Sequence, residues 1–326
     1  MKNKKAIMYL FLANTVSGIS QGISMISITW FISNTLGKPA LFGLMFLGAT
    51  AFSIPWGILA GTLVDKYDRK KIMLFIQTFG MLIIFGTALS GYALDKDTLW
   101  MAMIAYFTTV VAYNIHYPNL YAFAQEITEK EHFGRINSWI EIQGQTTFML
   151  AGAMAAFLME GKMFGFTFKA WEIHEIFLLD AFTYVIGFFF IFNINYTSLV
   201  DRSNRFTSTF KERLTDGFVY LKRFPLILLF GACSGFVFAA SLICSTYTLP
   251  IFINHFLNAN ESAYGITEAT FAFGCLLSGF FVLKLFSKSH LTLGIILLGI
   301  LASIMFVIIG WNKNLMILYL AYGVIG

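Results

Sequence analysis

Long apolar runs separated by short polar stretches make up most of this chain. A helix rises about 1.5 Å per residue, so about 20 apolar residues are needed to cross a hydrocarbon core of about 30 Å. Runs of at least this length cover residues 6–33, 40–64, 72–94, 98–124, 137–160, 175–196, 226–254, 263–286 and 290–310, and a further run opens at Asn314. The pattern predicts an all-α membrane protein with nine complete spans and the start of a tenth.

The first and last runs bear on the ends of the chain. Residues 6–33 are too long for a removable signal peptide and lack a small-residue cleavage site, so we expect a retained helix. The run from Asn314 reaches Gly326 after about 13 residues, which is too few to cross a bilayer. We therefore expect the polypeptide to be truncated.

Basic residues predict the orientation of the chain in the membrane. Lys and Arg concentrate in the cytoplasmic loops of membrane proteins. Placing the N-terminus in the cytoplasm puts 17 of the 22 Lys and Arg residues on the inner side, and one missed span would remove this bias. The sequence thus predicts a multi-pass protein with a cytoplasmic N-terminus.

The composition excludes several protein classes. Hydrophobic residues make up 58% of the 326 residues and charged residues 12%, against about 45–50% and about 25% in soluble domains. The aromatic share of 17% excludes a disordered chain. Cys233, Cys244 and Cys275 lie inside apolar runs, so we expect no disulfide. The net charge of +5 comes from residues that flank apolar runs, which indicates contact with the lipid bilayer and no nucleic-acid partner.

The longest polar stretch divides the chain. We predict an N-terminal six-helix bundle over residues 1–196, a cytoplasmic linker between bundles over 197–224, and an incomplete C-terminal bundle over 225–326. Apolar residues of the linker recur at steps of three or four, which predicts an amphipathic helix along the inner membrane surface. The alternative interpretation is a coil that binds a partner.

The loop between the second and third spans carries the most specific motif. It reads Gly61-Thr62-Leu63-Val64-Asp65-Lys66-Tyr67-Asp68-Arg69-Lys70-Lys71. A glycine near a helix end, an aspartate four residues on, an arginine four beyond that and a basic run together resemble motif A of the major facilitator superfamily. Six spans before a long cytoplasmic loop are similar to the first half of that fold. The resemblance implies a major facilitator-type helical bundle, truncated here from twelve spans.

Other segments resemble one branch of this superfamily. The branch comprises bacterial macrolide-efflux and enterobactin-exporter-like proteins. The similar segments are Thr29-Trp30, Asp68 where glycine is commoner, the region of Asn137, and Tyr264-Gly265-Ile266-Thr267-Glu268-Ala269. The resemblance implies the bacterial cell inner membrane and export of a small organic solute, such as a drug or a siderophore-like metabolite.

The resemblance also implies a gate at the motif A loop, formed by Gly61, Asp65, Arg69 and Lys70. A carboxylate at a helix end can contact an arginine of its own loop and the positive N-terminus of a facing helix. In the superfamily this loop contacts a helix of the second half and closes the cytoplasmic side. The alternative interpretation is a basic loop that only anchors the chain at the inner surface.

The sequence differs in two places from the proton-coupled drug exporters of the superfamily, and both differences bear on whether the chain is an antiporter. Residues 98–124 contain no arginine, and the fifth span lacks a Gly-Pro pair because Gln145 follows Gly144. Glycine and alanine residues of this span, among them Gly152, still allow close approach of a second helix. The fifth span is therefore predicted to pack closely against a neighbour without a proline kink.

Ionisable side chains inside the apolar runs are candidates for proton coupling, because a charge in the bilayer core costs about 3 kcal/mol or more. They are Glu141, Asp180, Glu268 and His116. A carboxyl group in apolar surroundings can exchange a proton near neutral pH, and histidine titrates in that range by itself. Alternatively, the carboxylates reach water at the interface and His116 is a hydrogen-bonded bundle residue.

The first span is unusually polar. Asn14, Ser17, Gln21 and Ser24 recur at steps of three and four, which places them on one helix face. We predict that Asn14 and Gln21 line a substrate path, and that Trp30 and Tyr113 are among the aromatic residues contacting a bulky amphipathic or cationic solute. The alternative is that the polar face joins neighbouring helices and the aromatic residues belong to the interfacial belt.

Motifs for catalysis and for cofactors are missing from the sequence. There is no Gly-rich phosphate loop, no paired Cys and His ligand set, and no nucleophile with a base in reach. His116 with Glu141 would offer only two metal ligands. We therefore expect no enzyme activity, no cofactor, no metal and no use of ATP.

Together these patterns predict a secondary active transporter that exports a small organic solute by proton antiport with alternating access. An importer or uniporter of the same fold is the first alternative. The second is a truncated, non-transporting remnant or a subunit that depends on a partner.

Overall fold

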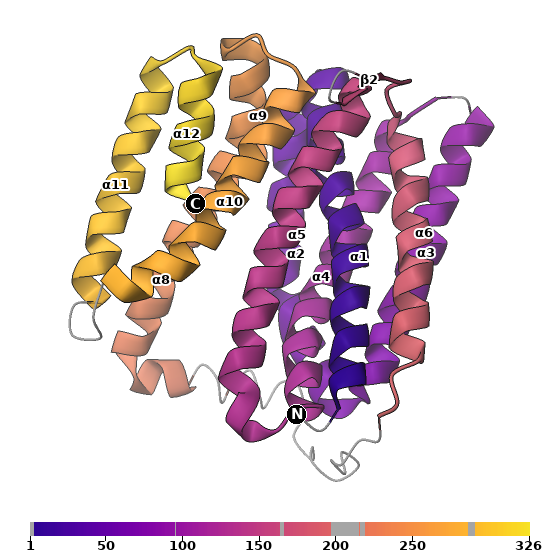
Figure 1. Ribbon diagram of the computed structural model, residues 1–326, viewed down its shortest axis with the longest axis vertical. Helices are drawn as coiled ribbons and strands as arrows, with labels where there is room; N and C mark the ends of the chain where they lie inside the picture. The colour runs from indigo at the N-terminus through magenta and orange to yellow at the C-terminus, as the bar shows by residue number, and fades with distance from the viewer. Residues whose placement is uncertain (1–2, 95, 164–165, 197–214, 216–218, 286–290) are drawn as a thin grey trace.

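The computed structural model describes residues 3–94, 96–163, 166–196, 215, 219–285 and 291–326. Long helices lie side by side in it (Figure 1). The helices of the earlier part are α1 (Lys4–Trp30), α2 (Pro39–Lys66), α3 (Arg69–Leu94), α4 (Leu99–Glu126), α5 (Phe133–Glu160) and α6 (Ile173–Phe192). Those of the later part are α8 (Pro225–Leu242), α9 (Leu249–Ile251), α10 (Glu261–Leu285), α11 (Leu291–Trp311) and α12 (Leu315–Ile325).

Short elements extend or connect these helices. The π-helical segments η1 (Phe31–Thr35), η3 (Ile243–Thr248) and η4 (Phe252–Phe256) continue α1, α8 and α9 in turn, and the 3-10 turn η2 (Lys130–His132) precedes α5. Two-residue strands β1 (Lys162–Met163) and β2 (Phe166–Thr167) pair antiparallel between α5 and α6. The predicted all-α class is confirmed, with this small hairpin as its only sheet among the described residues.

Local chemistry explains where several helices begin and end. Asn3 Oδ1 accepts a hydrogen bond from the Ala6 amide at 3.3 Å and so caps the start of α1. Pro39 occupies the first turn of α2, where its fixed φ fits and its missing N–H costs nothing. Gly161 ends α5 in the left-handed region at a φ of 70°, which glycine adopts without strain.

The predicted apolar runs fall on the helices, with boundaries shifted by a few residues. The run predicted at 226–254 is built from α8, η3, α9 and part of η4, and the run at 137–160 begins earlier, at Phe133. By length and composition, five helical stretches of the described residues could cross a membrane: Lys4–Thr35, Pro39–Lys66, Arg69–Leu94, Leu99–Glu126 and Ile173–Phe192. The count of nine complete spans therefore stays a prediction.

Helix α5 shows why length alone does not identify a lipid-facing helix. It has 28 residues, yet it is not among the five stretches because polar residues such as Asn137, Glu141 and Gln143 interrupt its apolar sequence. Gln143 bonds to α1, and Gly152 lies directly against α10. The helix is thus stabilised by contacts with other helices on more than one side.

The helices form two neighbouring groups in Figure 1, α1–α6 on one side and α8–α12 on the other. Helix α1 is the core of the first group, and its buried residues are contacted by α4, α5 and α6. Helices α5 and α10 pack along each other and join the groups. The division into bundles at 1–196 and 225–326 stays a prediction, and the linker predicted at 197–224 lies mostly outside the described residues.

The two groups diverge toward the end of the molecule where the N-terminus lies. There α8 and the second half of α10 lean away from α5 (Figure 1). Side chains in the first turns of α8 are exposed, with Leu226 at 79% and Phe230 at 73%. Near the opposite end, η1 contacts α9 and α5 contacts α10. Contact between the groups is therefore concentrated away from the N-terminus.

Candidate functional site

The motif A loop joins α2 to α3 at the end where the groups diverge. Asp68 starts α3, because its Oδ1 accepts a hydrogen bond from the Lys71 amide at 2.9 Å. A glycine at this position could not supply that oxygen. The departure from the commoner residue therefore adds a helix cap.

Arg69 is held by the end of α4. Its Nη1 lies 3.0 Å from Glu126 Oε2 and also donates to the carbonyl oxygen of Ala122. The backbone carbonyl of Arg69 accepts a hydrogen bond from Asn119 Nδ2 at 2.9 Å. The loop is thus fastened to α4 through both the side chain and the backbone of one residue.

Lys70 caps a different helix. Its Nζ donates to the carbonyl oxygens of Phe192 at 2.9 Å and Ile194 at 2.7 Å, at the C-terminus of α6. A cation there compensates carbonyl groups that have no helical partner and the negative end of the helix dipole. Lys70 therefore links the motif A loop to α6.

The other two predicted gate residues have no such contacts. Asp65 is exposed and forms no ion pair within the described residues, and a Cβ on Gly61 would meet no atom within 4 Å. The structure therefore does not join Asp65 to Arg69. Arg69 instead pairs with Glu126, a partner that sequence reasoning missed, although an acidic residue at the same end of the neighbouring span was a usable signal.

The polar face of α1 bonds to four other helices. Asn14 Oδ1 lies 2.7 Å from His116 Nε2 on α4, and Asn14 Nδ2 donates to Gln143 Oε1 on α5 at 3.0 Å. Gln143 Nε2 in turn donates to the Phe11 carbonyl at 2.6 Å and to the Thr15 hydroxyl. This network places His116 inside the bundle as a hydrogen-bonded residue.

The next turns of α1 continue the pattern. Ser17 Oγ bonds to Gln77 of α3, and Gln21 Nε2 donates to the Tyr184 hydroxyl of α6 at 3.1 Å. Ser24 Oγ donates to Asp180 Oδ2, also on α6, at 3.0 Å. These contacts correspond to the alternative in which the polar face joins helices, and a lining role for Asn14 and Gln21 stays a prediction.

No hydrogen bond or ion pair of the described residues joins any two of the four candidates for proton coupling. Glu141 is exposed and accepts a hydrogen bond from the Tyr121 hydroxyl. Asp180 is 0% exposed and Glu268 is 2% exposed. Asp180 Oδ1 and Glu268 Oε1 are buried without a hydrogen-bond partner. Asp180 and Glu268 are therefore buried carboxyl groups, whereas Glu141 is exposed to solvent or lipid.

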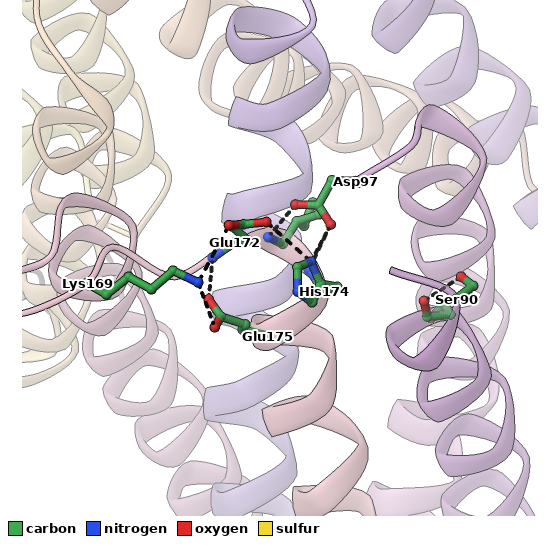
Figure 2. Close-up of polar contacts among 8 residues, drawn as sticks. Ser90, Asp97, Lys169, Glu172, His174 and Glu175 are labelled. Carbon is green, nitrogen blue, oxygen red and sulfur yellow. Dashed lines mark hydrogen bonds and ion pairs between the residues drawn. The ribbon is translucent and has the colours of Figure 1, made fainter. Parts of the chain in front are cut away.

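A cluster of charged residues lies at the start of α6 (Figure 2). Asp97 caps α6, because Oδ2 accepts from the Ile173 amide at 2.9 Å and Oδ1 accepts from the His174 amide at 3.3 Å. Its Oδ1 also lies 2.7 Å from His174 Nδ1. This carboxylate fastens the segment between α3 and α4 to the start of α6.

Two glutamates complete the cluster. Glu172 and Glu175 form a capping box at the first turn of α6, and Lys169 Nζ lies 3.3 Å from Glu175 Oε1 and 3.6 Å from Glu172 Oε1 (Figure 2). The hydrogen bond to Glu175 raises the pKa of the Lys169 amine. Sequence reasoning missed these residues, although the acidic residues around His174 next to an apolar run were visible.

Ligand atoms of Asp97, Glu172 and His174 lie within 4.8 Å of one another. Both oxygens of Asp97 already accept hydrogen bonds from α6, and His174 Nδ1 faces the same carboxylate. The three side chains are therefore explained as a helix cap. The expectation of no metal stays a prediction.

A cavity of about 220 Å³ opens beside this cluster. Its walls combine aromatic rings with carboxylates; they include Trp30, Phe31, Trp171, Asp97, Glu172 and Glu261. Trp30 is one of the four predicted lining residues, and its ring stacks on Tyr264 with centroids 6.2 Å apart. Tyr113, another of the four, is 54% exposed and contacts Tyr117. Of the four, only Trp30 faces this cavity.

Relatives of known sequence resemble the chain over most of its length. Macrolide efflux protein A of Streptococcus pyogenes is 23% identical over 276 residues, which are 83% of this chain and 64% of the relative. The protein of the same name from Enterococcus faecalis is 24% identical over 75% of this chain and 72% of its own length. MFS-type transporter YfiS of Bacillus subtilis is 21% identical over 71% of this chain and 53% of its own. The chain thus spans less than two thirds of the Streptococcus pyogenes relative.

Two solved structures share the fold. A bacterial homolog of the human lysosomal transporter Spinster, in an inward-facing and unoccupied conformation, matches 99% of this chain and 72% of its own with a TM-score of 0.65. A D-xylose-proton symporter matches 98% of this chain and 79% of its own with a TM-score of 0.63. Both are 14% identical to the chain, so the likeness concerns the fold alone.

The sequence model of the Major Facilitator Superfamily matches residues 10–326, nearly the whole chain. This match and the macrolide efflux relatives confirm the resemblance seen in the sequence. Proteins of this family are carriers and catalyse no covalent reaction, as expected for the chain. The chain therefore belongs to the major facilitator superfamily.

Proposed function

We propose that the protein exports a small organic solute across the bacterial inner membrane, coupled to proton entry, by alternating access. Family membership supports a carrier. The macrolide efflux relatives support export, and they favour a bulky amphipathic or cationic solute of the macrolide kind. The absence of a phosphate loop from the sequence supports a gradient as the energy source.

The arrangement of α5 and α10 carries the proposal. Gly152 and Gly265 bring these helices into close contact between the groups, while α8 leans away from α5 at the other end (Figure 1). Two rigid groups that touch at one end and diverge at the other correspond to one state of a rocking carrier. With the N-terminus in the cytoplasm, the divergent end and the motif A loop face inward.

The gate follows from this assignment. In the inward-open state Arg69 is engaged by Glu126, and Asp65 is exposed and free of ion pairs among the described residues. We expect Asp65 to contact the second half when the cytoplasmic side closes, while Gly61 leaves room for the approaching helix. Lys70 holds the loop on α6 in this state, and we expect the contact to persist on closure because both partners belong to the first helix group.

The cavity beside Trp30 supports a cationic solute. Aromatic faces and carboxylates attract organic cations together, because the ring quadrupole adds to the Coulomb attraction. Trp30, Trp171, Asp97 and Glu261 provide both kinds of group. We expect this cavity to be the outer part of the solute path.

Import is the second candidate. The likeness to a D-xylose-proton symporter covers 98% of this chain, so the fold is compatible with transport in either direction. Asp180 and Glu268, the two buried carboxyl groups among the candidates for proton coupling, would serve a symporter as well as an antiporter.

Reconstitution into proteoliposomes tests the proposal. The full chain is incorporated with an imposed pH gradient, and the movement of radiolabelled erythromycin is followed in both gradient directions. We expect uptake driven by an acidic lumen, as in antiport. Uptake driven by an acidic exterior would indicate import. Equal, gradient-independent movement in vesicles with and without the protein would contradict transport of this solute.

A further inference from the structure

The carboxyl group of Asp180 lies on α6 facing α1, seven residues after the start of α6. It is 0% exposed, and its Oδ2 accepts a hydrogen bond from Ser24 Oγ at 3.0 Å. Its second oxygen, Oδ1, is buried and has no hydrogen-bond partner. One half of the carboxyl group is thus available for a ligand.

A second hydroxyl lies beside Asp180. Ser20 is 2% exposed and faces the same carboxyl group, and its Oγ has no hydrogen bond of regular geometry to any other residue. Ser20 and Ser24 are four residues apart on α1, so both hydroxyls lie on the helix face turned toward α6. Four oxygen atoms of three side chains therefore meet between two packed helices.

No cationic side chain of the described residues compensates this carboxyl group. Within the described residues, no Lys, Arg or His forms an ion pair with Asp180. Its titratable neighbour is Tyr184, four residues along α6, whose hydroxyl accepts a hydrogen bond from Gln21 of α1. Helix α3 also packs against α6, and its Gln77, which bonds to Ser17, lies level with Gly187, about two turns farther along α6 than Asp180. An isolated buried carboxylate is costly, so the group is more stable when a proton or a metal cation neutralises its charge.

We infer that Asp180, Ser20 and Ser24 form a binding site for one monovalent cation in the first helix group. Carboxylate and hydroxyl oxygens are ligands for hard cations. A proton on the carboxyl group and a Na⁺ ion shared with the two hydroxyls neutralise the charge in the same way. The use of this cation in transport rests on the proposed function, whereas its binding does not.

Direct binding measurements test the inference on the purified full chain in nanodiscs. Titration with NaCl against choline chloride measures Na⁺ binding by calorimetry. Proton uptake after a pH jump, followed with an indicator dye in unbuffered solution, measures protonation. We expect the unmodified chain to bind one cation more than Asp180→Asn, either as Na⁺ by calorimetry or as a proton in the difference between the two uptake curves.

The serine variants separate a site from a lone carboxyl group. We expect Ser24→Ala and Ser20→Ala to weaken Na⁺ binding about tenfold each if Na⁺ is the ligand, or to shift the pH midpoint of proton uptake if the proton is. Ser17→Ala is the matched control, since it removes a buried hydroxyl of the same helix that bonds to Gln77. Its binding should equal that of the unmodified protein.

The outcomes are distinguishable. A folded Asp180→Asn protein, judged by size-exclusion chromatography, that keeps all Na⁺ and proton binding overturns the inference. If Asp180→Asn does not fold, Ser20→Ala and Ser24→Ala test the inference instead. Cation binding that is unchanged in both serine variants also overturns the inference. Cation binding without solute movement would retain the site and reject the proposed function.

Discussion

Gly152 of α5 and Gly265 of α10 lie against each other with no side chain between the two backbones. A Cβ on Gly152 would be 2.7 Å from the Gly265 carbonyl oxygen, and a Cβ on Gly265 would be 2.5 Å from the Gly152 carbonyl oxygen. Real Cβ atoms do not approach backbone oxygen this closely. The contact therefore depends on glycine at both positions.

Gly152→Val should separate the two helices at this contact. Backbone atoms of α10 cannot move aside like the end of a flexible side chain, so we expect a loss of about 1–3 kcal/mol in the free energy of unfolding. Solute transport should fall with it, because the outer end no longer closes. Unfolding by SDS in mixed micelles gives the first quantity and proteoliposome flux the second.

Gly86→Ala is the control for this substitution. Gly86 lies on α3 with no atom within 4 Å of a built Cβ, so its replacement should leave both quantities unchanged. A Gly152→Val protein as stable and as active as Gly86→Ala would show that α5 and α10 tolerate separation.

Glu126→Gln should loosen the motif A loop. The side chain of Glu126 is 7% exposed, so removal of its charge leaves the Arg69 guanidinium without its partner in a mostly dry environment. We expect a loss of about 1–3 kcal/mol in the free energy of unfolding. A double-mutant cycle with Arg69→Gln should give a coupling energy of about 1 kcal/mol. Additive effects of the two changes would show that the pair does not stabilise the loop.

Lys70→Met should release the end of α6. The variant keeps the length of the side chain but loses the donor to the Phe192 and Ile194 carbonyls, so we expect a loss of about 1 kcal/mol. Hydrogen exchange of amides near the end of α6 should become faster. Lys71→Met removes the same charge from an exposed neighbour and should not change this exchange. Equal protection in the two variants would exclude the capping role.

Asp97→Ala should destabilise the start of α6. The substitution removes an acceptor for the Ile173 and His174 amides and for the His174 ring, and such caps contribute about 1–2 kcal/mol. Lys169→Ala, at the exposed edge of the same cluster, should change stability too little to measure. Thermal unfolding of the two variants in detergent compares them, and similar midpoints would argue against the cap.

The positions of the helices could be predicted from the sequence, but the residues that bond one helix to another could not. Apolar runs predict the helices because the bilayer demands length and low polarity, which are local properties. The pairing of Arg69 with Glu126, in place of Asp65, depends on how α3 lies against α4. Spacing within one loop carries no information about that packing.

The polar face of α1 shows the same division between local and tertiary information. The period of three and four placed Asn14, Ser17, Gln21 and Ser24 on one face, and the structure has all four bonded to other helices. Whether such a face meets water or a neighbouring helix is decided by packing. The sequence could not select His116, Gln77, Tyr184 and Asp180 as the partners.

Asp65→Asn should separate transport from stability. Asp65 is exposed and forms no ion pair among the described residues, so the substitution removes no contact of this state. We expect the unfolding midpoint to stay constant while transport falls at least about tenfold, because closure of the cytoplasmic side loses about 1.4 kcal/mol of contact with the second half.

Asp68→Ala is the matched control three residues away. It removes the cap on the Lys71 amide and should lower stability by about 1 kcal/mol. Flux and thermal unfolding, measured on both variants at equal abundance, therefore give opposite patterns. Full transport by Asp65→Asn would remove Asp65 from the gate and leave the motif A loop a structural connection between α4 and α6.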